Sequence, residues 1–129
     1  MDPTFEVVTY ETPKGVALRL VGEMDLSNVG LLEQVSDGLI RDERAEIAID
    51  LRDLTFLDCT GLRALLRLRG CAGSNEAHLT LVAGAAQVMR LFQLTGVWER
   101  FEFVEPPEPD PGSVVSQTGS GLASVGASP

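Results

Sequence analysis

Four consecutive residues, Asp58-Cys59-Thr60-Gly61, place a carboxylate, a thiol and a hydroxyl where an apolar run gives way to a helical pattern. The start of a helix carries free N–H groups and favours negative charge. This position therefore suits an enzymatic nucleophile, a bound phosphate or a phosphorylated hydroxyl. The functional question is which of these three roles applies.

Cys59 is a poor candidate for an enzymatic nucleophile. A cysteine phosphatase would need an arginine six positions later, but Leu65 stands there and the nearest arginine is Arg63. The one histidine, His78, opens a predicted strand and has no motif around it, so a Cys–His pair lacks support. The sequence favours a small residue in a tight turn for Cys59, an edge or surface position for His78, and a protein that is not an enzyme.

Nucleotide and metal sites also lack sequence support. The chain has neither G-x-x-x-x-G-K-[ST] nor G-x-G-x-x-G after a strand, the motifs that hold phosphates. Four aspartates show no metal-ligand spacing, and we expect them to cap helices, form turns or face solvent: Asp25, Asp50, Asp53 and Asp58. We therefore expect no cofactor and no metal.

Two arginines follow the central loop. Arg63 and Arg67 are four residues apart and share one helical face, with leucines on the other faces. One interpretation is the solvated outer face of an amphipathic helix. The other is a basic edge that meets an acidic partner beside the loop. The sequence leaves both interpretations open.

The elements that must position this loop alternate between strands and helices. Apolar and β-branched runs predict strands at 5–11, 16–22, 46–51 (extended by 55–57), 78–83 and 101–104. Helical periodicity predicts helices at 26–41, 61–69 and 85–94. Ser27 or Asn28 is expected to cap the first helix, and Gly70 and Gly73 to end the second.

The order β-β-α-β-α-β-α-β predicts an α/β fold. Right-handed βαβ crossovers give a mixed, mostly parallel sheet of about five strands with three to four helices, and the first hairpin adds an antiparallel strand. Ligands of such folds gather where parallel strands end and helices begin. The loops at 22–25 and 58–61 both occupy such positions, so we expect them to meet.

Composition limits the partners and the extent of the fold. The net charge of −9 disfavours nucleic acid and anionic membranes as partners. The start of the chain has no signal-peptide pattern, no apolar stretch reaches about 18 residues, and Cys59 and Cys71 lie ~18 Å apart if one helix holds both. These features predict a cytoplasmic protein with reduced thiols.

The segment 105–129 begins with a proline-rich run and has no charge after residue 112, which predicts a domain at 1–104 and a disordered tail.

Three motifs occur in order: LVGEMD at 20–25, D-L-…-FLDCTGL at 50–62 and RLFQLTGV at 90–97. They resemble the L-x-G-E-[LIM]-D, D-L-…-F-[LMI]-D-[ST]-[ST]-G-L and R-[LV]-F-x-[LM]-[ST]-G-[LV] motifs of the STAS domain of bacterial anti-sigma-factor antagonists. The resemblance covers residues 5–104 and implies the STAS fold.

The resemblance also implies a non-enzymatic switch. Members of this family bind an anti-sigma factor, usually a serine kinase with an ATPase fold, and so release a sigma factor. The kinase phosphorylates the hydroxyl residue after the motif's aspartate, which adds about −1.5 to −2 charge to the contact surface, and a phosphatase removes it. Carried to this chain, the expected partner-binding residues are Glu23, Asp25, Asp58, Thr60, Gly61, Arg63 and Arg67.

Here the chain departs from the pattern at the acceptor itself. Cys59 holds the acceptor position and Thr60 the next one. Three interpretations follow, in our order of preference: a phosphorylation-independent antagonist, phosphorylation of Thr60, or oxidation of the Cys59 thiol. An alternative function is that of a STAS module in another complex, such as a lipid-transport ATPase or a stress-sensing assembly.

Overall fold

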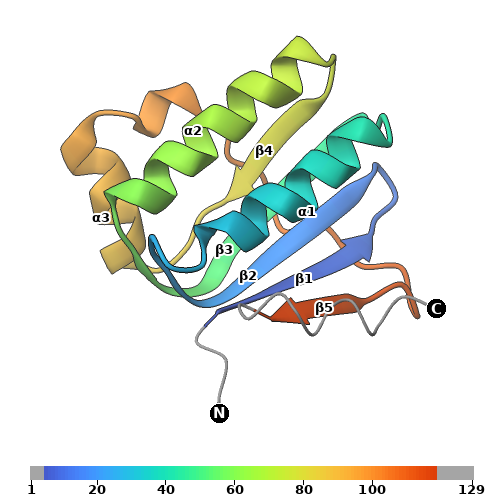
Figure 1. The fold of residues 1–129 in the computed structure, drawn as a ribbon, viewed down its shortest axis with the longest axis horizontal. Helices are drawn as coiled ribbons and strands as arrows, with labels where there is room; N and C mark the ends of the chain where they lie inside the picture. The colour runs from blue at the N-terminus through green and yellow to red at the C-terminus, as the bar shows by residue number, and fades with distance from the viewer. Residues whose placement is uncertain (1–4, 119–129) are drawn as a thin grey trace.

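The computed structural model describes residues 5–118, which form a five-stranded sheet with helices packed against it (Figure 1). The strands are β1 (Phe5–Glu11), β2 (Val16–Met24), β3 (Glu46–Leu57), β4 (His78–Val82) and β5 (Val115–Thr118). The helices are α1 (Val29–Arg41), α2 (Cys59–Ser74) and α3 (Ala86–Thr95), followed by a short 3-10 turn, Trp98–Arg100. Within these residues, no helix is both long and apolar enough to cross a membrane.

The sheet has the order β4-β3-β2-β1-β5. Strands β2, β3 and β4 are parallel neighbours, whereas β1 runs antiparallel to both β2 and β5. The parallel pairs are joined through α1 and α2, as βαβ units require. The predicted mixed, mostly parallel α/β fold is confirmed.

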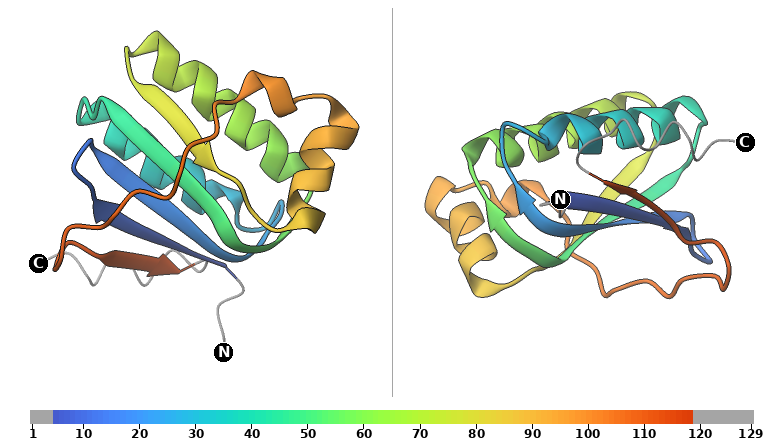
Figure 2. Two further views of the ribbon diagram at one scale, coloured as in Figure 1. Left: turned by 180° about the vertical axis from the view of Figure 1, so that it is seen from behind. Right: turned by 60° about the horizontal axis from the view of Figure 1, so that its bottom comes forward.

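Helices α1 and α2 lie side by side on one face of the sheet (Figure 2, right). Alternate residues of the central strands point toward them and are fully buried, among them Leu18, Leu20 and Ile49. Leu32 of α1 and Leu65 of α2 enter the same core. Each such side chain contributes about 1.5–3 kcal/mol through its burial, which fixes the helices over the central strands.

Helix α2 is longer at both ends than its sequence pattern predicts. It begins at Cys59 rather than Gly61, and it continues through Gly70 and Gly73 instead of ending there. A glycine inside a helix costs about 1 kcal/mol relative to alanine. Burial of Leu68 and Ala72 on the core face outweighs this cost and keeps the last turns helical.

The last strand lies elsewhere than expected. Residues 101–104 make only an isolated bridge, between Phe103 and Leu81, and the fifth strand is β5 on the free edge of β1. The expectation of disorder from residue 105 onward is therefore wrong for the described part of the tail, whereas 119–129 lie outside the described residues. Pairing with the unpaired edge of β1 gives this polar segment backbone partners that its composition does not reveal.

Candidate functional site

The two loops predicted to carry function meet at one edge of the sheet. Strands β2 and β3 are parallel, and Met24 pairs in register with Leu57. Asp25 and Asp58 follow these two residues directly, so both carboxylates belong to the edge where the two strands end. We call residues 23–28 and 58–61 the loop surface.

Asp58 fixes the entry into α2. It is the N-cap residue, and its Oδ1 accepts a hydrogen bond of 3.0 Å from the backbone N–H of Gly61. This bond satisfies one of the free N–H groups at the helix start. A Cβ at Gly61 would lie 2.5 Å from Cδ1 of Leu57 and 3.1 Å from Cε of Met24, so a larger residue there would displace the ends of these two buried side chains. Both residues therefore shape the loop, and a direct contact with a partner stays a prediction for them.

Asn28 organises the other loop. The residue is 7% exposed; its Oδ1 accepts a hydrogen bond from the Asp25 N–H at 3.0 Å, and its Nδ2 donates to the Glu23 carbonyl at 2.9 Å. The residue occupies the N-cap position of α1, as predicted, but its side chain does not bond to the helix. It holds the preceding loop instead, which brings Glu23 and Asp25 into a fixed arrangement.

The Asp25 carboxylate is also held locally. Its Oδ1 accepts hydrogen bonds from the Ser27 hydroxyl at 2.6 Å and the Ser27 N–H at 2.9 Å. These bonds, the hydroxyl bond most of all, lower the pKa of Asp25 below its usual value. Asp25 is therefore negatively charged at neutral pH, in the loop next to the one that Asp58 caps.

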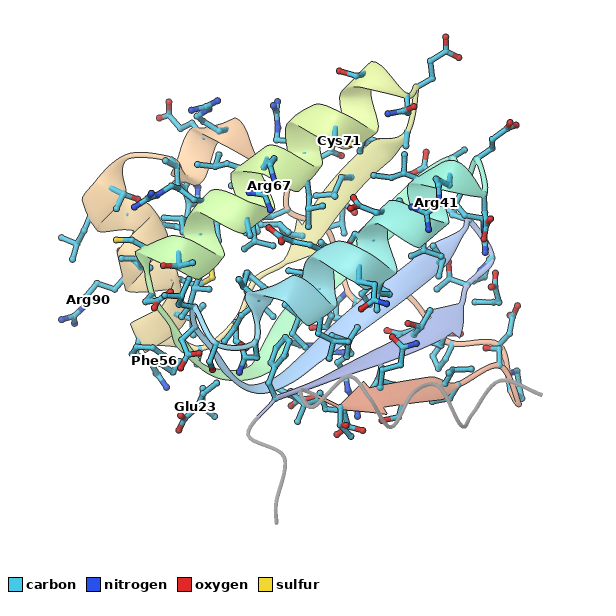
Figure 3. The ribbon with its side chains drawn as sticks, viewed as in Figure 1. Glu23, Arg41, Phe56, Arg67, Cys71 and Arg90 are labelled. Atoms are coloured by element: carbon cyan, nitrogen blue, oxygen red, sulfur yellow. The ribbon has the colours of Figure 1, made fainter. Side chains whose placement is uncertain are left out.

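The acceptor position is accessible. Cys59 is exposed as the first residue of α2, and Thr60 beside it is half-buried. Both cysteines are free, and Cys71 lies far along the same helix (Figure 3). One helix therefore holds both cysteines. The structure thus brings a thiol and a hydroxyl next to the Asp58 carboxylate on the loop surface.

Two exposed apolar side chains were not predicted: Leu26 of the loop surface and Phe56, which lies next to it in β3. Leu26 is 75% exposed and Phe56 47% exposed, and Phe56 pairs in register with Glu23 (Figure 3). A register irregularity between Gly22 and Glu23 interrupts the alternation of the strands there, and Phe56 is exposed although it lies in an apolar run. The sequence does contain a signal for the exposure of Leu26, because this apolar residue directly follows Asp25 in a polar loop.

The two arginines of α2 have different surroundings. Arg67 forms an ion pair with Glu33 of α1, so it links the two helices (Figure 3). Arg63 lies one turn nearer the loop surface, is exposed, and makes no ion pair within residues 5–118. A role in partner binding is thus better supported for Arg63 than for Arg67, and it stays a prediction for both.

Two of the four aspartates lie within β3, and only the full burial of Asp50 differs from the expected roles. Asp50 and Asp53 are within β3, where Asp50 is fully buried and pairs with Arg52 at 2.8 Å, and Asp53 pairs with Arg19 at 3.1 Å. The strand runs unbroken to Leu57, so these residues stabilise the sheet rather than a loop. Among the described residues, no group of three or more His, Cys, Asp or Glu side chains is placed to hold a metal.

With this geometry in place, comparison with known proteins identifies the class of protein. Residues 8–105 match a family model described as "Mlab, STAS domain", which covers most of the chain. The chain belongs to the STAS domain family.

Several proteins that are similar to this chain are named anti-sigma factor antagonists. The chain is 26% identical over 97 residues to the anti-sigma-B factor antagonist of Staphylococcus aureus, covering 75% of this chain and 88% of that protein. The structure is similar to an anti-sigma factor antagonist from Mycobacterium paratuberculosis, with a TM-score of 0.70 and 25% identity over 78% of this chain and 84% of that one. It also shares its fold with the Bacillus cell fate determinant SpoIIAA in the phosphorylated form, with a TM-score of 0.60 and 20% identity over 78% and 90% of the two chains.

Proposed function

We propose that this protein is a cytoplasmic, non-enzymatic anti-sigma-factor antagonist whose loop surface binds an anti-sigma factor and thereby releases a sigma factor. The observation that carries the proposal is the exposure of Leu26 and Phe56 beside the ordered carboxylates of the loop surface. The names of its relatives support the same role.

The chemistry of the surface indicates what the partner must offer. A few side chains that enter pockets on the partner supply most of the binding energy of an interface, and Leu26 and Phe56 are the exposed apolar candidates here. The carboxylates of Glu23, Asp25 and Asp58 around them favour a basic rim on that partner and fix its orientation. The family resemblance supplies the identity of such a partner, an anti-sigma factor with a kinase-type ATPase fold.

The Cys59 position determines how the complex is controlled. A phosphate on Thr60 would add negative charge next to Asp58, and an oxidised Cys59 would add a polar or charged group there. Either group would weaken binding, because it must lose water inside the contact and a phosphate is also repelled by Asp58. Only phosphorylation of Thr60 would require a phosphatase. We favour a third case, in which neither residue is modified and the amount of protein sets the response.

Cys59→Ser distinguishes these cases. With the cognate kinase and ATP, the wild-type protein should gain little phosphate, whereas the serine variant should gain it stoichiometrically because the hydroxyl then follows Asp58. The nearly isosteric change should alter the free energy of unfolding by less than about 1 kcal/mol. Phosphate on the wild type that Thr60→Val abolishes would show that the acceptor has moved by one residue.

The experiment that tests the proposed function is affinity purification of the full chain from its native host, with mass spectrometry of the retained proteins. An ATPase-fold anti-sigma factor should be retained and should be lost with Leu26→Ala/Phe56→Ala. Leu94→Ala is the matched control, since Leu94 is 77% exposed but lies on α3.

The alternative is a STAS module of another complex. The observation that favours it is the cysteine in place of a hydroxyl acceptor. Recovery of a transporter ATPase or a large stress-sensing assembly, in place of an anti-sigma factor, would support this alternative and contradict the proposed function.

A further inference from the structure

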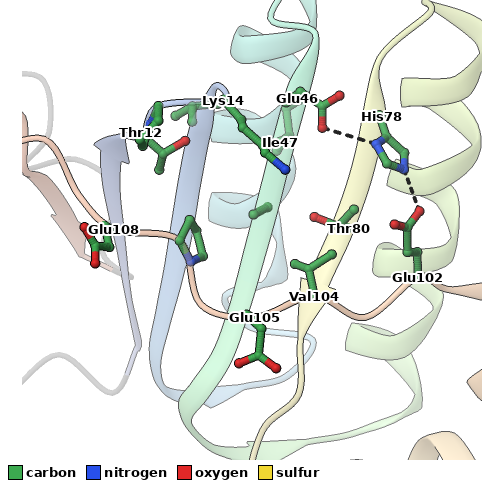
Figure 4. Close-up of a pocket in the computed structure, with 14 residues that line it drawn as sticks. Thr12, Lys14, Glu46, Ile47, His78, Thr80, Glu102, Val104, Glu105 and Glu108 are labelled. Carbon is green, nitrogen blue, oxygen red and sulfur yellow. Dashed lines mark hydrogen bonds and ion pairs between the residues drawn. The ribbon is translucent and has the colours of Figure 1, made fainter.

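The face of the sheet opposite α1 and α2 is crossed by the segment 105–111, which we call the proline strap (Figure 2, left). Between the strap and the sheet lies a cavity of about 370 Å³, which we call the strap cavity (Figure 4). Its sheet wall comes from the first residues of β3 and β4, including Glu46, Ala48 and Thr80. It therefore lies at the opposite end of these strands from the loop surface. Its volume falls in the range of natural small-molecule sites.

The strap is attached on both sides of the cavity. Before it, the N–H of Val104 donates to the Leu81 carbonyl at 2.8 Å, and the N–H of Leu81 donates to the Glu102 carbonyl at 2.9 Å. At its far end, the N–H of Asp110 donates to the Glu11 carbonyl at 2.8 Å. The prolines between these points have fixed φ angles and no N–H to donate. The strap thus forms a stiff wall that spans the cavity without filling it.

Thr80 provides a polar group inside this cavity. The residue is 6% exposed, lines the cavity, and makes no side-chain hydrogen bond within the described part of the chain (Figure 4). The hydroxyl is therefore available to a polar atom of a bound molecule. Ala48, Val104 and Pro107 supply the apolar surroundings.

The charges around the cavity are mainly negative. Glu46 and Glu102 both bond to the ring of His78, at 3.1 and 2.7 Å (Figure 4). Glu105 and Glu108 of the strap also line the cavity and form no ion pair within residues 5–118. The lining contains one lysine, Lys14, so carboxylates outnumber cations whether or not His78 is protonated. A cavity lined mostly by one sign of charge attracts the opposite sign.

We propose that the strap cavity binds a small organic cation, an ammonium group on an apolar body. The apolar body lies against Ala48, Val104 and Pro107, an ammonium N–H donates to the Thr80 hydroxyl, and the glutamates provide the attraction. This site is separate from the loop surface and does not depend on the proposed function.

The test uses the full chain and 2-phenylethylammonium as the probe, followed by amide chemical shifts in NMR. The amides of Ala48, Thr80 and Val104 should shift, with a Kd in about the millimolar range expected for so small a molecule. The matched control ligand is 3-phenylpropionate, an anion of similar size. Equal or tighter binding of the anion would overturn the proposal, and so would shifts that avoid the cavity or no shifts at millimolar probe.

Three variants test the individual contacts. Thr80→Val should weaken binding about three-fold or more, because the hydroxyl is lost while the shape is kept. Glu105→Gln/Glu108→Gln lies on the exposed strap, outside the core, and should weaken binding about two- to five-fold at low salt and little at high salt. Lys14→Gln should strengthen binding of the cation.

The control variant is Asp37→Asn, which removes one negative charge from α1 on the other face of the sheet and should leave the Kd unchanged. If Lys14→Gln weakens binding, the site prefers anions and the proposal is wrong. If Thr80→Val and the double glutamine variant both leave the Kd unchanged, the probe binds elsewhere, which equally overturns it.

Discussion

The loop surface and the proline strap lie at different parts of one sheet and are held in different ways. In the loop surface, side chains make the decisive bonds: Asn28 holds one loop and Asp58 caps the helix that follows the other. The strap and β5 are held mainly by backbone bonds to β4 and β1. Side-chain bonds make a surface sensitive to single substitutions, whereas backbone pairing depends on the presence of the segment more than on its residues.

The largest expected effect is on partner binding through the loop surface. Leu26→Ala/Phe56→Ala should weaken the complex with the anti-sigma factor by about 100-fold or more, because apolar side chains at the centre of an interface carry most of its binding energy. Calorimetric titration of purified proteins measures this. The control Leu94→Ala should change the Kd less than two-fold. Equal losses in both variants would remove the distinction between the loop surface and the rest of the molecule.

The next effect is on stability and sharpens the same distinction. Asn28→Ala should lower the free energy of unfolding by about 2 kcal/mol, because it leaves the Asp25 N–H and the Glu23 carbonyl without their buried partner. Denaturant unfolding measures the loss. Ser27→Ala removes one exposed bond in the same loop and should cost about 0.5 kcal/mol. Similar values for the two variants would show that the buried amide does not hold the loop.

Removal of the strap and β5 tests how much their backbone hydrogen bonds stabilise the sheet. A chain ending after Glu105 loses β5 and should lose about 1 kcal/mol, seen as a melting temperature about 4–8 °C lower and faster amide exchange along β1. A chain ending after Thr118 keeps every described strand and should melt like the full chain. An unchanged melting temperature in the shorter chain would show that the segment after Glu105 does not stabilise the sheet, as expected of the disordered tail that its composition predicts.

The sequence predicts the loop surface well because its determinants are local. Apolar runs place β2 and β3, and an aspartate directly after each strand marks the loop that leads into the next helix. The exposure of Phe56 was missed because it goes with a register irregularity between two strands, a property that neither strand shows alone. The sequence offers Ser27 or Asn28 as the cap of α1; Asn28 occupies that position, but its side chain bonds to the preceding loop, a difference that local patterns do not show.

The strap was missed for a different reason. Its prolines and charges leave too little apolar area to predict folding, and β5, which follows it, pairs with β1, which lies about a hundred residues earlier in the chain. Such pairing depends on a free edge that exists only after the rest of the sheet has formed. The composition describes how this segment would behave alone. It does not show that the free edge of β1 is available for pairing.

The smallest expected effect is a pH dependence at the junction of the sheet and the strap. His78 opens β4 and is held between Glu102, just before the strap, and Glu46 of β3. The hydrogen bond to Glu102, and after it the one to Glu46, raises the pKa of His78 above its usual value of 6.5. Protonated His78 is thus favoured in the folded protein, and the stabilisation is present in full below about pH 6.5 and lost as the pH rises through the raised pKa.

His78→Gln should therefore cost more stability at about pH 6 than at about pH 8.5. The difference should stay below about 1 kcal/mol, because the histidine and both glutamates are largely exposed and solvent screens their attraction. Denaturant unfolding of both proteins at the two pH values measures it. Glu102→Gln should reduce the same difference, and the chain ending after Glu105 should retain it because Glu102 is still present. A loss that is equal at both pH values, or larger at the higher one, would show that His78 stabilises the fold by packing and not by its charge.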